Sequence, residues 1–459
     1  MHEVDTIAAI ATALGEGSVA IVRLSGPESI AVVDRIFKSR KRLSEQDTHT
    51  LTYGHIVDPQ TEEVVDEVLV ALMRAPRSYT REDVVEIHCH GGIIAVQRIL
   101  RLVLRYGARL AEPGEFTKRA FLNGRIDLPQ AEAIIDLIRS KTDQAQKLAM
   151  RQVEGRLSQE IRELRQKLIE LLAHVEVTID YPEHDVEDVT THHILVEGEK
   201  VVERIEQLLK GAQTGRILRE GLRTVILGRP NVGKSSLMNA LSRTNRAIVT
   251  DIPGTTRDIL EEQISLRGIP IHIIDTAGIR ETEDIVERIG VERSREALQE
   301  ADLVLFMIDA SRELTWIDKE LLQEVRKYPT IVILNKLDLP RKVKTDEILQ
   351  LTDDAPIIEM SLKEGRGIDA LEDEVERLFF AGALEGKEGT YVSNARHISL
   401  LEKAKRQLEE ALSSARMGLT LDLVAVDLRN AWETLGEVIG QAVGEDLLDQ
   451  IFSQFCLGK

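Results

Sequence analysis

The sequence is poor in aromatic residues, in cysteines and in long apolar runs, and each deficit excludes a class of protein. Only 3% of its 459 residues are Phe, Trp or Tyr, which disfavours a stacking platform for single-stranded nucleic acid. The two cysteines, Cys89 and Cys456, cannot form a disulfide framework and fit a reducing cytosol. No apolar run approaches the roughly 18 residues of a membrane-spanning helix, so we expect no membrane association.

Positive charge is also in deficit. The chain has 59 Lys and Arg against 78 Asp and Glu, a formal net charge of −19, which disfavours broad, non-specific binding to a phosphate backbone. The first residues, MHEVDTIAAIATALGEG, contain acidic residues and no Lys or Arg, whereas a secretory signal needs a basic start. We therefore expect a cytoplasmic protein.

The periodicity of apolar residues changes along the chain and divides it into segments. Residues 1–118 mix strand and helix patterns and predict a small α+β domain. Residues 119–218 have a helical period, residues 219–383 alternate strand and helix as a doubly wound α/β fold does, and residues 384–459 are helical again. Each helical half is amphipathic and needs a partner for its apolar stripe, which favours one helical domain interrupted by an inserted α/β domain. Four domains in series is the alternative.

Five short motifs follow in fixed order between Gly228 and Lys363: GRPNVGKSS, TDIPGTTRD, DTAG, NKLD and SLK. The first follows the apolar strand TVIL and opens the helix LMNAL, the context that a P-loop requires. Its glycines let backbone N–H groups wrap phosphates, and the helix N-terminus favours negative charge. Together the motifs predict a site that binds a guanine nucleotide and cleaves its phosphate.

Each motif has an expected role. Lys234 should reach the β- and γ-phosphates, and the Ser235 hydroxyl should bind Mg²⁺. In DTAG, Asp275 should hold Mg²⁺ through water and the Gly278 N–H should meet the γ-phosphate.

NKLD and SLK are expected to bind the base. The carboxylate of Asp338 can accept from two donors that guanine has and adenine lacks, while Asn335 supports the loop, which predicts GTP over ATP. Ser361 and Lys363 would cover the other side of the base. The motif residues expected around the nucleotide are Asn231, Val232, Gly233, Lys234, Ser235, Ser236, Thr250, Asp251, Ile252, Pro253, Gly254, Thr255, Thr256, Asp275, Thr276, Ala277, Gly278, Asn335, Lys336, Leu337, Asp338, Ser361, Leu362 and Lys363.

One position departs from the Ras pattern. DTAG is followed by Ile279, where Ras-like enzymes carry a glutamine that orients water, and Ile cannot do so. Hydrolysis must therefore use another polar group, and the next segment, IRETEDIVERIGVERS, offers the carboxylates of Glu281, Glu283, Asp284 and Glu287. No arginine finger is evident, so another cation is expected to neutralise the transition state.

These motifs, with the segments DTIAAIATALGEGSVAIVRLSG, GEFTKRAFLNGRIDLPQAEAIIDLI and FSQFCLGK, resemble the MnmE (TrmE) family of tRNA-modification GTPases along the whole chain. The resemblance implies an N-terminal α+β domain that binds folate and dimerises (1–118), a discontinuous helical domain (119–218 and 384–459) and an inserted Ras-like G domain (219–383). It also implies a homodimer that works with a flavin-dependent partner, MnmG (GidA). Together they would attach an aminomethyl or carboxymethylaminomethyl group to carbon 5 of the wobble uridine of certain tRNAs.

The resemblance further implies the cofactors and the residues that bind them. A 5-formyl- or methylene-tetrahydrofolate would be the one-carbon source or its analogue, and K⁺ would stimulate hydrolysis and draw two G domains together. Thr256 would bind Mg²⁺ beside Ser235, and Glu287 would orient the attacking water. The implied K⁺ ligands are Asn231, Thr250, Ile252 and Thr255. The alternatives are helix capping for Glu287 and turn chemistry for Asn231.

For folate, the resemblance implies Arg23, Glu86, Arg125 and Lys459. Arg and Lys suit the glutamate carboxylates of folate, and a carboxylate suits the donor edge of the pteridine. The alternatives are a surface ion pair for Arg23 and a solvated strand face for Glu86.

The two cysteines, Cys456 and Cys89, lie in different sequence contexts. The resemblance places Cys456 near the folate pocket as a catalytic residue of unassigned chemistry, and a buried structural cysteine is the alternative. A prenylation box fits poorly because Gly458 is not aliphatic. On the strand DVVEIHCH, His88 and His90 share a face with Glu86 while Cys89 faces the other way, so we expect no zinc site.

Two other functions compete with the enzyme. A regulatory GTPase switch, for example in ribosome assembly, would act by binding alone, and bound tetrahydrofolate would distinguish it from the enzyme. A structural helical dimer with a decayed G domain is disfavoured because the lysine, serine and aspartate motifs are intact.

Overall fold

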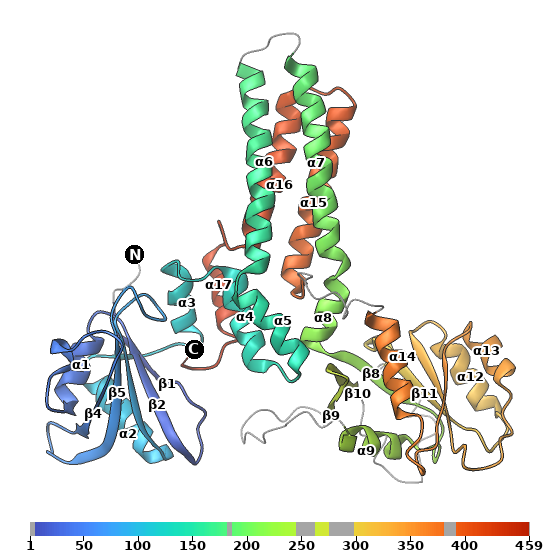
Figure 1. Cartoon of the computed structure of the whole chain (residues 1–459), viewed down its shortest axis with the longest axis horizontal. Helices are drawn as coiled ribbons and strands as arrows, with labels where there is room; N and C mark the ends of the chain where they lie inside the picture. The colour runs from blue at the N-terminus through green and yellow to red at the C-terminus, as the bar shows by residue number, and fades with distance from the viewer. Residues whose placement is uncertain (1–4, 181–185, 245–261, 275–297, 381–391, 459) are drawn as a thin grey trace. The chain divides into compact units, whose positions relative to one another are not determined.

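The computed structural model describes residues 5–180, 186–244, 262–274, 298–380 and 392–458 (Figure 1). The chain forms two compact units, Met1–Ile135 with Leu435–Lys459, and Asp136–Thr434. The domain boundaries drawn from the sequence differ from this division, and they stay a prediction.

The first unit contains a seven-stranded sheet in the order β3-β4-β5-β6-β2-β1-β7. Helices α1 (Ser29–Ile36) and α2 (Ile93–Arg105) bury their apolar stripes with one face of this sheet. The alternation predicted for β6 is confirmed, because Cys89 is buried in that core while His88 and His90 are not. The strands are β1 (Ile7–Ile10), β2 (Gly17–Ser25), β3 (Phe37–Lys38), β4 (Thr50–Val57), β5 (Val64–Met73), β6 (Val84–Gly91) and β7 (Arg109–Leu110).

A small helical cluster completes the first unit. Helix α3 (Glu115–Leu122), the first part of α4 (Leu128–Arg139) and α17 (Glu445–Phe452) pack around Phe452 and Phe455. The last residues then reach β1, where a Cβ at Gly458 would lie 2.3 Å from the Ile10 carbonyl oxygen. The two ends of the chain therefore belong to one unit.

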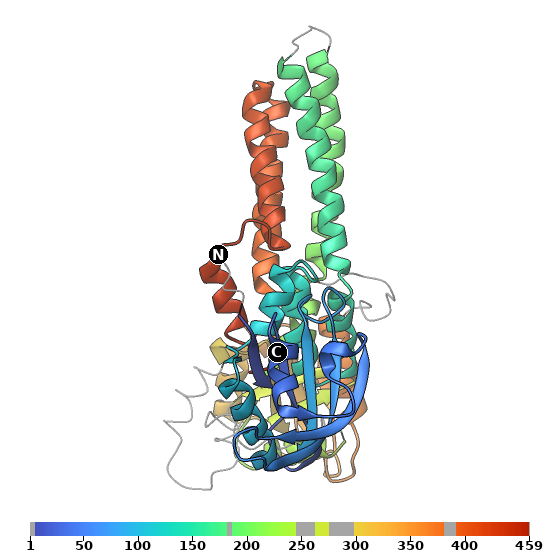
Figure 2. The same cartoon turned by 90° about the vertical axis from the view of Figure 1, so that its left-hand side faces the viewer.

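The second unit contains long helices from both sides of the α/β segment: α5 (Asp143–Val153), α6 (Arg156–Asp180), α7 (Val186–Lys210), α8 (Ala212–Glu220), α15 (Ala395–Arg416) and most of α16 (Leu421–Val438). Figures 1 and 2 both show α6, α7, α15 and α16 side by side. Helices α7 and α15 approach closely, since a Cβ at Gly198 would lie 2.6 Å from Leu412. Segments more than 150 residues apart in the chain thus bury one another's apolar stripes, as amphipathic helices require.

The α/β segment forms a six-stranded sheet in the order β13-β12-β11-β8-β10-β9, parallel except for the β9–β10 pair. Separate apolar cores on its two faces make it doubly wound, as predicted. The strands are β8 (Leu222–Leu227), β9 (Glu262–Leu266), β10 (Ile269–Ile274), β11 (Leu303–Asp309), β12 (Thr330–Asn335) and β13 (Ile357–Glu359). The helices are α9 (Lys234–Thr244), α12 (Trp316–Val325), α13 (Thr345–Thr352) and α14 (Ile368–Phe380).

In this segment the sequence pattern predicts helix starts near Gly233, Glu287, Asp318 and Gly367. Those near Gly233, Asp318 and Gly367 are confirmed by α9, α12 and α14. The start predicted near Glu287 lies outside the described residues. Within the described ranges, no helix combines the length and apolarity needed to cross a membrane.

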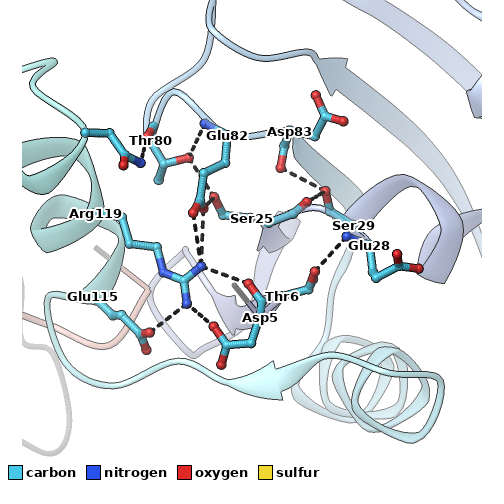
Figure 3. A network of polar contacts seen from close by, with 12 residues as sticks. Asp5, Thr6, Ser25, Glu28, Ser29, Thr80, Glu82, Asp83, Glu115 and Arg119 are labelled. Atoms are coloured by element: carbon cyan, nitrogen blue, oxygen red, sulfur yellow. Dashed lines mark hydrogen bonds and ion pairs between the residues drawn. The ribbon is translucent and has the colours of Figure 1, made fainter. Parts of the chain in front are cut away.

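A polar network ties α3 to the strands of the first unit (Figure 3). The Arg119 guanidinium, 12% exposed, donates to the Asp5 carboxylate at 2.5 Å, to Glu115 at 3.0 Å and to Glu82 at 3.2 Å. Arg109 donates to Asp5 and Glu115 as well. Burial alone would raise the pKa of Asp5 and Glu115, but the two guanidinium groups outweigh it and hold both pKa values below the usual range.

We predict that Arg119→Met loosens the first unit, because three carboxylates lose a largely buried partner. The free energy of opening β1 and β2 should fall by about 3–5 kcal/mol. Hydrogen exchange of these strands in the full chain measures it. Arg98→Met is the control, because it removes an exposed pair with Glu63 and should cost at most about 1 kcal/mol. Equal losses in both variants would contradict the structural role of the network.

Candidate nucleotide-binding site and a second candidate site

The P-loop connects β8 to α9 through backbone conformations that need glycine. Gly228 and Gly233 have φ values of +140° and +114°, which L side chains rarely adopt. A Cβ at Gly233 would also lie 2.3 Å from the Asn335 side-chain nitrogen. Asn231 takes φ +65° and is exposed. The loop is therefore a tight turn that aims the N-terminus of α9 outward, which suits an anion.

Lys234 folds back onto this loop. Its Nζ donates to the carbonyl oxygens of Gly228, at 2.5 Å, and Arg229, at 3.1 Å. Burial lowers the pKa of Lys234. An arriving phosphate can replace these carbonyl contacts with a charge-assisted bond. Ser235 and Ser236 lie beside it, exposed at the start of α9.

Asn335, only 3% exposed at the end of β12, joins two of the motifs. Its Nδ2 donates to the Val232 carbonyl at 2.8 Å, and its Oδ1 accepts from the Leu362 N–H at 3.3 Å. Parallel strands end at the same edge of a sheet, so their following loops meet there. The structure therefore brings the P-loop, NKLD and SLK together.

The side chain expected to bind guanine is held by the SLK loop. Ser361 Oγ donates to Asp338 Oδ1 at 3.1 Å, and Lys363 Nζ lies 3.7 Å from Asp338 Oδ2. The SLK residues thus orient Asp338 in addition to lining the space beside it. Leu337 and Leu362, one from each motif, pack against the apolar cores on opposite faces of the six-stranded sheet.

Asp309, at the end of β11, is a site residue that motif analysis missed. Lys336 Nζ donates to its Oδ2 at 2.7 Å, and Ser311 donates to its Oδ1 from both N–H and Oγ. Burial alone would raise the pKa of Asp309, but Lys336 and Ser311 hold it below the usual range. The signal available in the sequence was an acidic residue closing the otherwise apolar strand LVLFMID.

Several predicted site residues lie outside the described residues: Thr250, Asp251, Ile252, Pro253, Gly254, Thr255, Thr256, Asp275, Thr276, Ala277, Gly278, Glu287 and Lys459. The Mg²⁺ and K⁺ sites that depend on them therefore stay predictions. In the part of the chain that the structure describes, no three His, Cys, Asp or Glu side chains are grouped to hold a metal ion.

A second candidate site lies in the first unit, around Arg23. Its Nε donates to Glu86 Oε1 at 2.8 Å, and the two side chains are 18% and 16% exposed. A further Arg23 nitrogen lies 3.4 Å from the carbonyl oxygen of Gly458, the residue before Lys459. The ion pair expected as the alternative for Arg23 is thus present, but it is largely buried rather than on the open surface.

Tyr79 connects this pair to Arg125. The Arg23 guanidinium lies 5.6 Å and that of Arg125 4.9 Å from the centre of the Tyr79 ring, within cation–π range. Arg125 also donates to the Tyr79 carbonyl at 3.0 Å. Tyr79 itself was missed, because an isolated aromatic residue in a loop carries no motif.

A cavity of about 570 Å³ opens beside Tyr79. Its lining includes His49, Arg77, Arg81 and Arg125, and no carboxylate among the described residues lines it. Three arginines around one cavity are notable in so acidic a chain, and they favour an anionic ligand. The sequence does carry Arg77 and Arg81 close together, in RAPRSYTRED.

The cysteines differ sharply in environment. Cys456 is exposed, so the alternative of a buried structural cysteine is wrong. Cys89 is buried, and burial, with a smaller effect of Asp66, raises its pKa to about 11. The Cys89 thiol is therefore protonated and unreactive near neutral pH.

Comparisons with known proteins cover the whole chain. The family model "MnmE helical domain" matches residues 128–456, and "GTP-binding protein TrmE N-terminus" matches residues 6–125. A relative from Geobacillus thermodenitrificans, named tRNA modification GTPase MnmE, is 59% identical over 100% of both chains. The protein of that name from Bacillus subtilis is 57% identical over 99% of this chain and 100% of its own. Among solved structures, the FeoB G domain from Methanococcus jannaschii is 20% identical over 34% of this chain and 95% of its own, with a TM-score of 0.25.

We predict that Asn335→Ala weakens nucleotide binding. The Val232 carbonyl and the Leu362 N–H lose their buried partner, which costs about 1–3 kcal/mol. Thermal unfolding of the full chain with and without a GTP analogue measures both stability and binding. Asn239→Ala, exposed on α9, is the matched control and should change neither. An unaltered shift on adding the analogue to Asn335→Ala would contradict the joining role of this amide.

Proposed function

The chain belongs to the MnmE family of tRNA modification GTPases, and from this premise we propose a specific activity. It is a K⁺-stimulated GTP hydrolase that works with an MnmG (GidA)-like flavoprotein in the cytoplasm. The pair adds an aminomethyl or carboxymethylaminomethyl group to carbon 5 of the wobble uridine of tRNA. The observation that carries the nucleotide part is the convergence of the P-loop, NKLD and SLK at Asn335.

In this proposal the described motif residues bind GTP. Lys234 exchanges its carbonyl contacts for the β- and γ-phosphates, and Ser235 binds Mg²⁺ at the start of α9. Asp338 accepts from the two donors of guanine, which adenine cannot replace. The hydrogen bond from Ser361 supports this role, because it orients the carboxylate, and the nearby charge of Lys363 favours its ionised form.

The hydrolytic step uses residues carried over from the family motifs. Thr256 joins Ser235 at Mg²⁺, and Asn231, Thr250, Ile252 and Thr255 hold K⁺. This cation supplies the charge that an arginine finger supplies elsewhere. Glu287 orients the attacking water, in place of the glutamine that Ile279 replaces.

The second candidate site binds 5-formyl- or methylene-tetrahydrofolate through Arg23, Glu86, Arg125 and Lys459. Glu86 suits the donor edge of the pteridine, and the arginine-lined cavity suits the glutamate carboxylates. Its support is that Arg23, which pairs with Glu86, and Arg125 both lie over the Tyr79 ring. Cys456, exposed two residues before Gly458, is the catalytic candidate beside it.

The working form in this proposal is a homodimer. The sheet face of the first unit opposite α1 and α2 exposes the cross-strand pair Tyr53 and Leu69, at 57% and 40%. Arg23 and Glu86 lie on this same face. A second copy covering the face would bury these apolar side chains and enclose the folate site. In this proposal residues 1–118 are the domain that binds folate and dimerises, residues 119–218 and 384–459 form the helical domain, and residues 219–383 form the inserted G domain.

Reconstitution tests the proposal directly. The full chain is mixed with an MnmG-like protein, tRNA, GTP, K⁺, methylene-tetrahydrofolate as the carbon source and ammonium or glycine as the nitrogen source, and the wobble uridine is analysed by mass spectrometry. We expect a modified uridine that requires GTP hydrolysis. Glu287→Ala is the control, and it should bind GTP but lose roughly 10²- to 10⁴-fold in turnover. GTP hydrolysis with an unmodified uridine would favour the regulatory switch instead.

The role of K⁺ has its own test. Replacing K⁺ by Na⁺ at constant ionic strength should depress GTP hydrolysis by roughly 10-fold or more, because the transition state loses its neutralising cation. Steady-state rates of phosphate release measure this. Asn231→Ala should abolish the difference between the cations. Equal rates in K⁺ and Na⁺ for the unaltered chain would remove Asn231 from this role.

A further inference from the structure

A buried ion pair connects the P-loop to a helix that carries none of the five nucleotide motifs. Arg229, the second residue of GRPNVGKSS, donates from Nε to Asp318 Oδ1 at 2.8 Å. The Asp318 side chain is 1% exposed and that of Arg229 25%. Asp318 belongs to the first turn of α12, 89 residues further along the chain.

The other oxygen of Asp318 is also engaged. Its Oδ2 accepts from the Thr315 N–H at 2.9 Å and from Thr315 Oγ at 2.8 Å. In return, the Thr315 hydroxyl accepts from the Asp318 N–H, which completes a capping box. Arg229 of the P-loop therefore holds Oδ1, and Thr315 at the start of α12 holds Oδ2. With both oxygens bonded, the carboxylate has one orientation.

The backbone of Arg229 contacts the phosphate-binding lysine. Lys234 Nζ donates to the Arg229 carbonyl at 3.1 Å. The loop between them includes Asn231 at φ +65°, a conformation that costs a non-glycine residue energy unless the surroundings hold it. Arg229 is thus the point at which a rigid helix can hold this loop.

We propose that Asp318, acting through Arg229, is a positioning residue for GTP binding. The carboxylate fixes the Arg229 side chain, and the Arg229 backbone then keeps the P-loop in the conformation that receives the phosphates. Preorganisation of this kind lowers the ordering cost of binding. The inference rests on the proposed binding of GTP at the P-loop, and it adds α12 to the residues that determine affinity.

The test compares three variants of the full chain with the unaltered protein: Arg229→Met, Asp318→Asn, and the two combined. We expect each single variant to bind a fluorescent GTP analogue about 10- to 100-fold more weakly, the scale of a lost hydrogen bond to a charged group. KM for GTP should rise while kcat changes far less, because a binding conformation is lost and not a reacting group. The double variant should lose little more than either single one.

Thr315→Ala is the matched control for stability. It removes the hydroxyl bond to Asp318 but leaves the bonds from the backbone N–H of residue 315 and from Arg229, so it should lower the melting temperature while GTP affinity falls far less than in Arg229→Met. Arg229→Lys should recover part of the affinity, because it keeps the charge but not the fork of donors. If Arg229→Met leaves Asp318 buried and unpaired and does not fold, the double variant removes that charge and supplies the measurement.

The outcomes separate this inference from the proposed function. Failure of the unaltered chain to bind GTP would overturn the proposed function. Tight binding by the unaltered chain and by both Arg229→Met and Asp318→Asn would overturn only the positioning role. Equal loss of affinity in Thr315→Ala and Arg229→Met would also overturn it, because the effect would then follow stability alone.

Discussion

The side-chain amide of Asn335 donates to the Val232 carbonyl and accepts from the Leu362 N–H, and the candidate nucleotide site depends on these two bonds. They join the loops that follow two different elements of the sheet, and they do so away from water. Breaking either bond would leave a buried polar group without a partner, which costs free energy. The position of Asn335 therefore fixes the position of both loops. The same side chain explains Gly233, where a Cβ would lie 2.3 Å from Asn335 Nδ2.

Other polar contacts extend this arrangement outward. Asp309 accepts a hydrogen bond from Lys336, and Asp338 accepts one from Ser361. Farther from the nucleotide motifs, Asp318 of α12 accepts one from Arg229 of the P-loop. Each of these carboxylates is satisfied by hydrogen bonds, which is the condition for burying charge without destabilising the fold. The result is a set of loops whose backbone is positioned before any ligand arrives, as tight binding requires.

The α/β sheet and its neighbouring helices are one packed body. Leu148 of α5 and Leu218 of α8 belong to the same core as Ile271 of β10, and α8 leads directly into β8. In the first unit, a network around Arg119 performs a similar task, joining α3 to Asp5, just before β1, and to Glu82 in the loop before β6. In both places a few buried, hydrogen-bonded polar groups specify how the neighbouring elements fit together. Apolar packing alone is less specific.

The sequence by itself determined the elements and the class of chemistry. Glycines with lysine after an apolar strand predict a P-loop, and period-two or helical patterns predicted most strands and helices, because these depend on neighbours within a few residues. It did not reveal the roles of Tyr79, Asp309 or Asp318. An apolar strand that ends in Asp, or a Thr-x-x-Asp cap, predicts a strand end or a helix start but not which side chain the carboxylate meets across the fold. Only the tertiary structure decided their partners, because strand order and helix packing place residues side by side that lie far apart in the chain.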